Sequence, residues 1–252
     1  MKIWLLDNGS IVIDHAQLMW NIGSGTPVRI PSYGVLIEHD EGLFLFDTGF
    51  DLEHTNAVLP FELPEQTSEQ TIAAQLERCG FSTDDVTVLV NSHLHFDHCG
   101  GNKHVRKAKV VLHEKELAEA RECQPFERLG YSDRSWDWEG ARFETVSGDV
   151  ELAKGLWLYE TPGHTIGHYS ALARPANGDR ALLFAFDVVY TGEAFEKGVQ
   201  PGFHYDPVAG VRSIQRLREL AAEHDAEILF SHDMDAWHGY KHAPDFYELQ
   251  EG

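Results

Sequence analysis

The sequence is poor in cysteine. Its 252 residues include three cysteines, Cys79, Cys99 and Cys123, and no CxxC spacing. A small, odd number of cysteines argues against a disulfide framework. The simplest interpretation is that all three are reduced thiols in a cytoplasmic protein.

Basic residues are also scarce. Lysine and arginine number 20 against 41 aspartates and glutamates, which gives a net charge of −21. Such a surface repels phosphate backbones, so we expect no nucleic-acid partner, and anionic membranes are disfavoured for the same reason. The acidity is most simply a device for solubility, and bound cations would offset part of it.

Long hydrophobic runs are missing as well. No apolar stretch approaches the roughly 20 residues that span a bilayer, and the first residues, MKIWLLDNGS, lack the apolar region of a signal peptide. We therefore expect no membrane partner and a cytoplasmic location. A hydrophobic content of 42% is sufficient for a sizeable core, and the length suits one large domain over residues 1–252.

Strand and helix patterns alternate along both halves of the chain. Residues 2–14 predict a hairpin around Asp7-Asn8-Gly9, while 15–31 and 50–67 read as long irregular connections. Strands are expected at 33–38, 43–46, 84–91, 110–113, 143–146, 149–152, 155–160, 169–174, 181–186 and 226–230, with a turn at 175–179, and helices at 68–79, 114–121 and 207–224. This order predicts an α/β sandwich of sheets with helices outside.

Residues 122–142 fit none of these patterns. The segment is aromatic, charged and rich in turn residues. It is either a lid, a contact with another subunit in a homodimer, or a plain surface loop.

The densest chemistry lies in residues 91–102, which read NSHLHFDHCGGN. His93, His95, Asp97 and His98 follow a β-branched apolar run, and histidine with carboxylate suits zinc and related divalent metals. On an extended segment the first three would share one face. A turn after Asp97, made easy by the two glycines, would bring His98 to the same place.

Three further side chains follow predicted strands, and each has an ordinary interpretation when taken alone. His164 and His232 could be surface histidines, and Asp187 could be a helix cap. Together with the motif they make seven ligands, too many for one tetrahedral zinc. Two metals could share them, one held by His93, His95 and His164, the other by Asp97, His98 and His232, with Asp187 bridging. Metal binding lowers the pKa of water towards neutrality and so provides a nucleophile.

The pattern H-x-H-x-D-H with a downstream His, Asp and His resembles the metallo-β-lactamase superfamily. The resemblance covers essentially the whole chain and implies an αββα four-layer sandwich with two metals at the sheet edge. It is specific for fold and metal site but not for substrate. The acidic charge disfavours the nucleases of this superfamily, and the missing signal peptide disfavours the secreted β-lactamases. The flavo-diiron type is disfavoured too, because it would need a flavin domain that this sequence does not show.

Two local features point to lactonases. SHLHFDHCGGN closely resembles the motif of the N-acyl-homoserine lactonases, and Tyr190 stands three residues after Asp187 as in their D-x-x-Y, where the phenol hydrogen-bonds the substrate carbonyl. The resemblance therefore implies a quorum-quenching lactone hydrolase. In such an enzyme Asp97 would pass a proton to the leaving oxygen. Zinc is the expected metal, with iron, manganese or cobalt as alternatives.

Other functions stay open on the sequence alone. The segments LLDNGS, PFERLGYSD, DPVAGVRS and SHDMDAW resemble 4-pyridoxolactonase of vitamin B6 degradation, which is the main alternative. A glyoxalase II-like thioesterase and a non-catalytic metal-binding protein are weaker ones.

The two lactones make different demands on the pocket. The acyl tail of a homoserine lactone needs an apolar channel, for which the candidates are Met19, Trp20, Phe50, Phe61, Phe96 and Phe186. Each of these would otherwise be a core residue. The polar ring of pyridoxolactone would need groups such as Arg29, His54, Tyr131 or Arg134.

Overall fold

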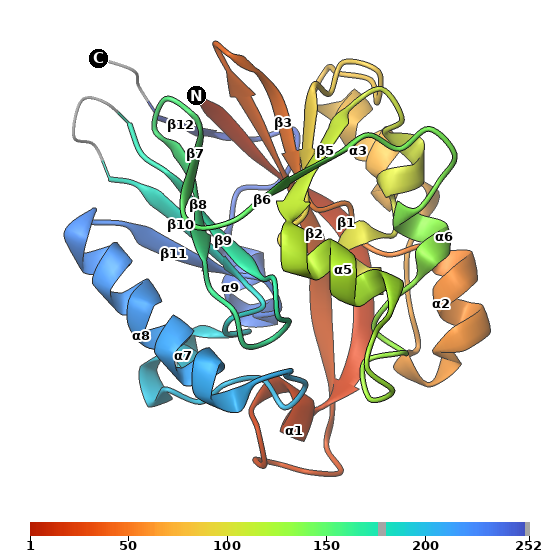
Figure 1. Cartoon of the computed structure of the whole chain (residues 1–252), viewed down its shortest axis with the longest axis vertical. Coiled ribbons are helices and arrows are strands. Elements are labelled where there is room, and N and C mark those ends of the chain that lie inside the picture. Colours follow the sequence, from red (N-terminus) through yellow and green to blue (C-terminus); the bar gives the residue numbers. More distant parts are fainter. Residues whose placement is uncertain (176–179, 250–252) are drawn as a thin grey trace.

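The computed structural model describes residues 1–175 and 180–249. Most of the turn expected at 175–179 therefore lies outside the described residues. Within the described ranges the chain forms two β-sheets, of seven and five strands, packed face to face (Figure 1).

The first sheet mixes antiparallel and parallel pairs. Its strands lie in the order β12 (Tyr247–Glu248), β1 (Lys2–Asp14), β2 (Pro27–His39), β3 (Gly42–Phe46), β4 (Val88–Val90), β5 (Lys109–His113) and β6 (Phe143–Val146). Strands β3 to β6 run parallel, and the other pairs are antiparallel. Parallel neighbours place their carboxyl ends at one edge, where functional loops gather.

The second sheet comes from the other half of the chain. Its order is β11 (Glu227–Phe230), β10 (Leu182–Phe186), β9 (Tyr169–Ala173), β8 (Leu156–Glu160) and β7 (Val150–Ala153). Only β10 and β11 pair in parallel among these strands. Their carboxyl ends are therefore adjacent, and Asp187 and His232 follow them directly.

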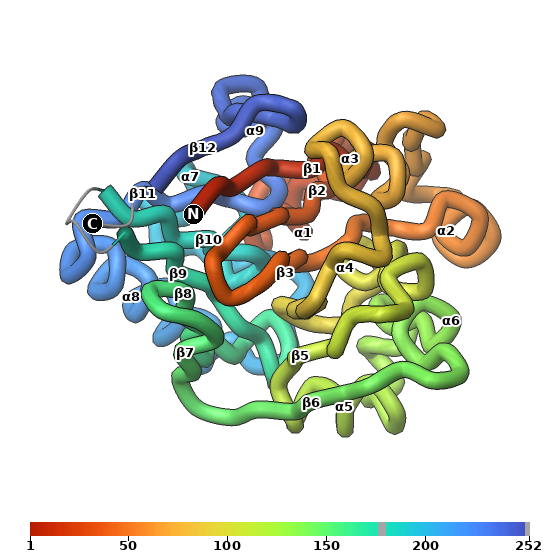
Figure 2. Tube along the Cα trace, turned by 90° about the horizontal axis from the view of Figure 1, so that it is seen from above, coloured from red at the N-terminus to blue at the C-terminus, as the bar shows by residue number. Residues whose placement is uncertain are grey.

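Helices cover both outer faces of the sandwich. The first sheet carries α3 (Ile72–Arg78), α5 (Glu114–Arg121) and α6 (Asp133–Trp136), and the second carries α7 (Gly192–Lys197) and α8 (Pro207–Glu223). Seen from above, α8 and α3 lie on opposite sides of the paired sheets (Figure 2). Shorter helices join the strands: α1 (His15–Leu18), α2 (Leu52–Val58), α4 (Phe96–Cys99) and α9 (Met234–Gly239), with 3-10 turns at Pro60–Glu62, Ser68–Gln70 and Asn102–His104. This is the four-layer αββα sandwich that the sequence predicts.

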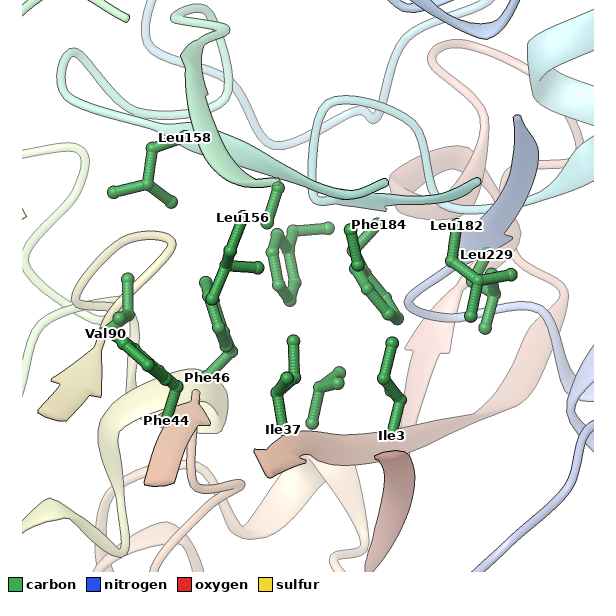
Figure 3. Packing of buried hydrophobic residues seen from close by; sticks show 14 of the residues in the cluster. Ile3, Ile37, Phe44, Phe46, Val90, Leu156, Leu158, Leu182, Phe184 and Leu229 are labelled. Carbon is green, nitrogen blue, oxygen red and sulfur yellow. The ribbon is translucent and has the colours of Figure 1, made fainter. Parts of the chain in front are cut away.

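Alternation along the strands builds the layers. Ile3 and Leu5 of β1 face the second sheet, whereas Trp4 and Leu6 face the helices, because successive side chains point to opposite faces of a strand. Between the sheets, residues such as Phe46 of β3 and Phe184 of β10 fill one continuous apolar layer (Figure 3). The layer fixes the two sheets against each other, and with them the strand ends that carry the site.

Three local expectations need correction. Residues 2–14 form one strand and no hairpin, because Gly9 (φ +99°) is absorbed as an irregularity where the pairing of β1 with β2 shifts between Asp7 and Ser10. Residues 27–31 belong to β2, since they pair with the second half of β1. The connection 50–67 contains α2, whose first turn is capped by the Asp51 side chain accepting a hydrogen bond from the backbone N–H of His54.

The segment 122–142 is more than a surface loop. Trp136 of α6 is buried against the first sheet, and the carbonyl of Gly130 accepts a hydrogen bond from the backbone N–H of Phe96. The segment is therefore packed directly onto the histidine motif. A role of this segment as a lid or as a dimer contact stays a prediction.

In the described part of the chain, no helix has both the length and the apolar character that crossing a membrane would require.

Candidate metal centre

The histidine motif changes conformation in its middle. His93 lies between β4 and α4, and His95 is the N-cap of α4 with an extended backbone (φ −67°, ψ 153°). Asp97 and His98 then lie in the single turn of α4, so the chain turns at Phe96, one residue before the point the sequence suggests. The extended half and the helical half aim their side chains at one place.

Gly100 has a packing role in addition to permitting a turn. Its backbone is ordinary, with φ −58°. A β-carbon at this position would lie 2.3 Å from the backbone nitrogen of Asp51, so only glycine allows the motif to pack this closely against the preceding connection.

The other three predicted ligands come from the second sheet. His164 lies between β8 and β9, Asp187 follows β10, and His232 follows β11. Phe186 adopts a left-handed backbone (φ +46°), which is costly for a phenylalanine. Ser231 holds it there by donating a hydrogen bond to its carbonyl. The strained turn points the Asp187 carboxylate out of the strand and into the site.

Asp187 lies at the middle of the cluster. Its Oδ2 is 3.9 Å from His93 Nε2 and 3.4 Å from His164 Nε2. Its Oδ1 is 3.1 Å from His98 Nε2 and 3.3 Å from His232 Nε2. His232 Nε2 is also 3.3 Å from Oδ2, so it lies within reach of both oxygens. The carboxylate therefore lies between His93 and His164 on one side and His98 on the other, which is the position that a bridging ligand would need.

The cluster contains the two groups that the sequence predicts and a third, His93, His98 and Asp187, that overlaps both. One of the two predicted groups comprises His93, His95 and His164, with His95 Nδ1 only 2.9 Å from His164 Nε2. The other comprises Asp97, His98 and His232, with Asp97 Oδ2 3.7 Å from each of the two Nε2 atoms. All of these side chains are buried.

The donor set fits divalent metal ions. The Nε2 atoms of His93 and His98 and the Oδ1 of Asp187 are buried and make no hydrogen bond, and buried polar atoms rarely lack a partner in a folded protein. Imidazole nitrogen with carboxylate oxygen is the ligand chemistry of zinc and its neighbours. Ions at this position would satisfy the buried atoms that the protein alone leaves unpaired.

Burial keeps the rings of His93, His95 and His164 in the neutral form that can bind a metal. Burial is the largest influence on His93, His95 and His164 and lowers the pKa of each ring. These rings are therefore neutral near pH 7, and a neutral ring has the free lone pair that a metal requires. Burial alone would raise the pKa of Asp187, but His98 and His232 outweigh it and hold that pKa well below its usual value.

The cluster opens into a cavity of about 150 Å³. Five side chains of the cluster line its floor, and an apolar wall comes from six separate parts of the chain. These wall residues are Ile11, Ile13, Ile30, Leu59, Phe61, Phe96, Leu129 and Phe203. Tyr190, Gln17, Glu62 and Gly130 also line it. Phe61 and Phe96 are two of the aromatic residues expected from the sequence, and Phe61 is 66% exposed at the rim.

The other four aromatic or apolar candidates lie elsewhere. Met19 packs in the core between the second sheet and its helices, Phe186 packs between the sheets, and Phe50 is buried beside the cavity without lining it. Trp20 is exposed and contacts His204 edge-on. Sequence alone does not separate a core aromatic from a cavity aromatic, because both are apolar and neighbour the same loops.

The polar residues considered for a pyridoxolactone do not line the cavity either. Arg29 pairs with Glu65, and Tyr131 donates its hydroxyl hydrogen to Glu116. His54 and Arg134 are likewise absent from the lining.

Comparison with known proteins agrees with this geometry. The family model described as the metallo-beta-lactamase superfamily matches residues 28–232, from β2 to the last histidine of the cluster. The chain belongs to the metallo-beta-lactamase superfamily.

Relatives within the superfamily match almost the full length. The N-acyl homoserine lactonase AttM of Agrobacterium fabrum is 32% identical over 260 residues, covering 98% of each chain. The lactonase AiiA of Bacillus thuringiensis subsp. kurstaki is 29% identical, covering 93% of this chain and 94% of its own. A solved N-acyl homoserine lactone hydrolase with N-hexanoyl-L-homoserine bound at its catalytic metal centre superposes with a TM-score of 0.87, at 28% identity and 98% coverage of both chains.

This metallo-β-lactamase-type centre is held by a second set of contacts. His93 Nδ1 lies 3.0 Å from Ser92 Oγ, and the Nδ1 atoms of His164 and His232 each lie 2.9 Å from a backbone carbonyl. When the outer ring nitrogen is occupied in this way, Nε2 is left to face the centre. His168, which is not one of the predicted ligands, accepts a hydrogen bond from the backbone N–H of Asp187.

Asp47 is the functional residue that sequence reasoning missed. Its carboxylate accepts hydrogen bonds from the backbone N–H and hydroxyl of Ser92, and it lies 2.8 Å from His98 Nδ1. The available signal was the sharp end of β3 at Asp47-Thr48-Gly49, where Asp47 has a left-handed backbone (φ +55°). Strained backbone of this kind collects at functional sites.

Tyr190 lines the cavity beside His232. Its ring lies 4.6 Å, centre to centre, from the ring of His232. Burial, reinforced by Asp187 and Asp97, raises the pKa of its phenol well above the usual value. The phenol therefore keeps its hydrogen and is a donor at neutral pH.

We predict that Asp47→Asn weakens metal binding. The substitution removes the charge that orients His98, and loss of such an outer contact costs about 10- to 100-fold in metal affinity. Zinc affinity measured against a competing chelator should fall by this factor. Asp40→Asn, on the exposed turn between β2 and β3, is the matched control. Equal affinities for the two variants would show that Asp47 does not position the ligand.

Proposed function

We propose that the protein is a lactone hydrolase that opens N-acyl-homoserine lactones to the hydroxy acid and so quenches quorum signals. The observation that carries the proposal is a buried group of metal ligands at the floor of an apolar-walled cavity. Full-length relatives named as lactonases support the same activity. The ring would lie on the ligands and the acyl chain along the wall of Ile11, Leu59 and Phe61.

The same proposal assigns the seven clustered side chains as ligands of two divalent ions. We propose zinc, because five histidines with two carboxylates form its usual donor set. Bound there, the ions would supply Lewis acidity and a water molecule of lowered pKa.

Asp97 is the proposed proton carrier. It lines the cavity and also lies 3.7 Å from His98 and His232, so it would lie between the floor and a lactone ring bound there. A water oxygen forms a bond to the lactone carbonyl carbon, and the ring C–O bond breaks. The proton released by the water passes through Asp97 to the leaving oxygen, which becomes the hydroxyl group of the product.

Tyr190 is the proposed donor to the substrate carbonyl. Its phenol lines the cavity beside Asp187 and keeps its hydrogen. When water adds to the carbonyl carbon, negative charge develops on the oxygen, and a fixed O–H donor stabilises it more than it stabilises the neutral ester.

Two features of the setting belong to the proposal as well. We place the protein in the cytoplasm, which its three free cysteines support. We also propose a homodimer contact through residues 122–142, where Phe126 and Leu129 expose large apolar side chains.

The first prediction for this site concerns substrate choice. Metal-loaded enzyme is offered long- and short-chain homoserine lactones, γ-butyrolactone, 4-pyridoxolactone and a glutathione thioester. We expect the highest kcat/KM for acyl-homoserine lactones, because only they fill the apolar wall. A higher value for 4-pyridoxolactone or for the thioester would overturn the proposed substrate, and inactivity on every compound would overturn the hydrolase itself.

The second prediction concerns Asp97→Asn. The amide cannot carry the proton, so kcat should fall by about 10²- to 10⁴-fold. Metal content, measured by elemental analysis, separates this effect from loss of an ion. Asp137→Asn, at an exposed position in 122–142, is the control and should match the wild type. Near-normal turnover of Asp97→Asn with its full metal content would remove Asp97 from the proton path.

A further inference from the structure

Among the cavity-lining side chains, one carboxyl group has no part in the chemistry above. Glu62 ends the short turn Pro60–Glu62, and its side chain lines the cavity between the apolar wall and the ligands. Its Oε2 is buried and has no hydrogen-bond partner. A buried acceptor in this state lowers stability unless something donates to it.

The backbone around Glu62 aims the group inward. Leu59 before the turn is buried in the cluster that underlies the cavity, and Leu63 after it is left-handed (φ +43°). Phe61 points to the exposed rim. The chain thus reverses sharply at this point, and the Glu62 side chain is directed toward the cavity instead of into water.

Arg29, which lies near Glu62, is already paired with other groups. Arg29 forms an ion pair with Glu65 at 2.9 Å and hydrogen bonds with Ser10 and the carbonyl of Leu63. No ion pair to Glu62 is formed within the described residues. Burial raises the pKa of Glu62 to about 8, and the charge of Asp97 adds to this effect while His232 opposes it. The carboxyl group therefore lies close to the reaction centre yet is paired with no protein group.

The position of Glu62 suggests which part of a substrate it meets. A lactone ring bound over the ligands would place its first substituent at the boundary between the floor and the wall. The wall beyond Glu62, formed by Leu59, Phe61 and Ile11, is apolar and suits a hydrocarbon chain. A polar group between ring and chain is the only part of such a substrate that Glu62 can bind.

We propose that Glu62 is a specificity-determining residue that accepts a hydrogen bond from the amide N–H joining the acyl chain to the lactone ring. The inference rests on the proposed function and deepens it. An ammonium group on an unacylated amino lactone shares the N–H chemistry, but it would leave the apolar wall uncovered. Glu62 thus selects lactones with an amide beside the ring over lactones that carry a plain alkyl chain.

The test compares two substrates that differ at this one group. N-hexanoyl-homoserine lactone carries the amide, whereas an α-alkyl-γ-butyrolactone of equal chain length has the same ring and tail without the N–H. Glu62→Leu removes the acceptor, and Glu62→Gln keeps an acceptor oxygen. Glu53→Gln, on the exposed face of α2, is the control. Thermal unfolding confirms that each variant is folded.

For Glu62→Leu we expect kcat/KM on the amide substrate to fall about 10- to 100-fold, mainly through KM, because the buried amide N–H would lose its acceptor. The α-alkyl lactone has no N–H that could lose its acceptor, so its kcat/KM should change by less than about threefold. Glu62→Gln should retain most of the discrimination. An unchanged ratio between the two substrates, or an equal loss on both, would overturn the inference while leaving the lactonase activity intact.

A binding measurement separates this inference from the proposed function. Calorimetry with the ring-opened N-hexanoyl-homoserine requires no turnover, and the wild type should bind it more tightly than Glu62→Leu by a similar factor. Equal affinities would overturn the inference even in an inactive enzyme. A larger Glu62-dependent effect on unacylated homoserine lactone would overturn the amide assignment in favour of an ammonium group.

Discussion

The site depends on one buried carboxylate placed between two sets of histidines. Asp187 stands at the end of a fully buried strand, where an ionised group is costly unless opposite charges or strong donors surround it. Its Oδ2 faces His93 and His164, its Oδ1 faces His98, and His232 lies 3.3 Å from both oxygens. The strained Phe186, the hydrogen bond from Ser231 and the contact with His168 all maintain that orientation. The sandwich supplies this position by packing the end of β10 against the end of β4.

Chemistry and selectivity come from different parts of the fold. The ligands follow strands held by the apolar layer between the sheets, so their positions are rigid. Ile11 and Ile13 of β1 and Ile30 of β2 form one part of the cavity wall. Much of the rest comes from connecting segments, with Leu59 and Phe61 at the turn Pro60–Glu62, Leu129 of 122–142, and Phe203. Loops of this kind can vary without disturbing the centre. This division explains how one superfamily can keep its metal site and change its substrates, and it places the choice of lactone with residues such as Glu62 and Phe61.

The sequence predicts the centre better than its surroundings. One signal is the close spacing of histidines and aspartate in the motif, and the other is a single histidine or aspartate after each of several apolar strands. Because the ends of neighbouring strands converge, these signals predict that His93 and Asp187 belong to one site. The α5 helix is also predicted at its true bounds. The sequence does not reveal that Asp47 orients His98, since the two are 51 residues apart and meet only in the fold. Met19 and Phe50 were expected at the cavity and pack in cores instead, because apolar character alone does not determine the side on which a ring is buried. The single strand β1 was read as a hairpin, since Gly9 is typical both of a turn and of an irregularity within a ladder.

In the proposed centre Asp187 would bridge two ions. The most direct test is anomalous X-ray diffraction from crystals of the zinc-loaded protein, collected at the zinc edge. We expect two separate peaks on either side of the Asp187 carboxylate, one among His93, His95 and His164 and the other among Asp97, His98 and His232. A single peak, or a pair that Asp187 does not contact, would contradict this arrangement.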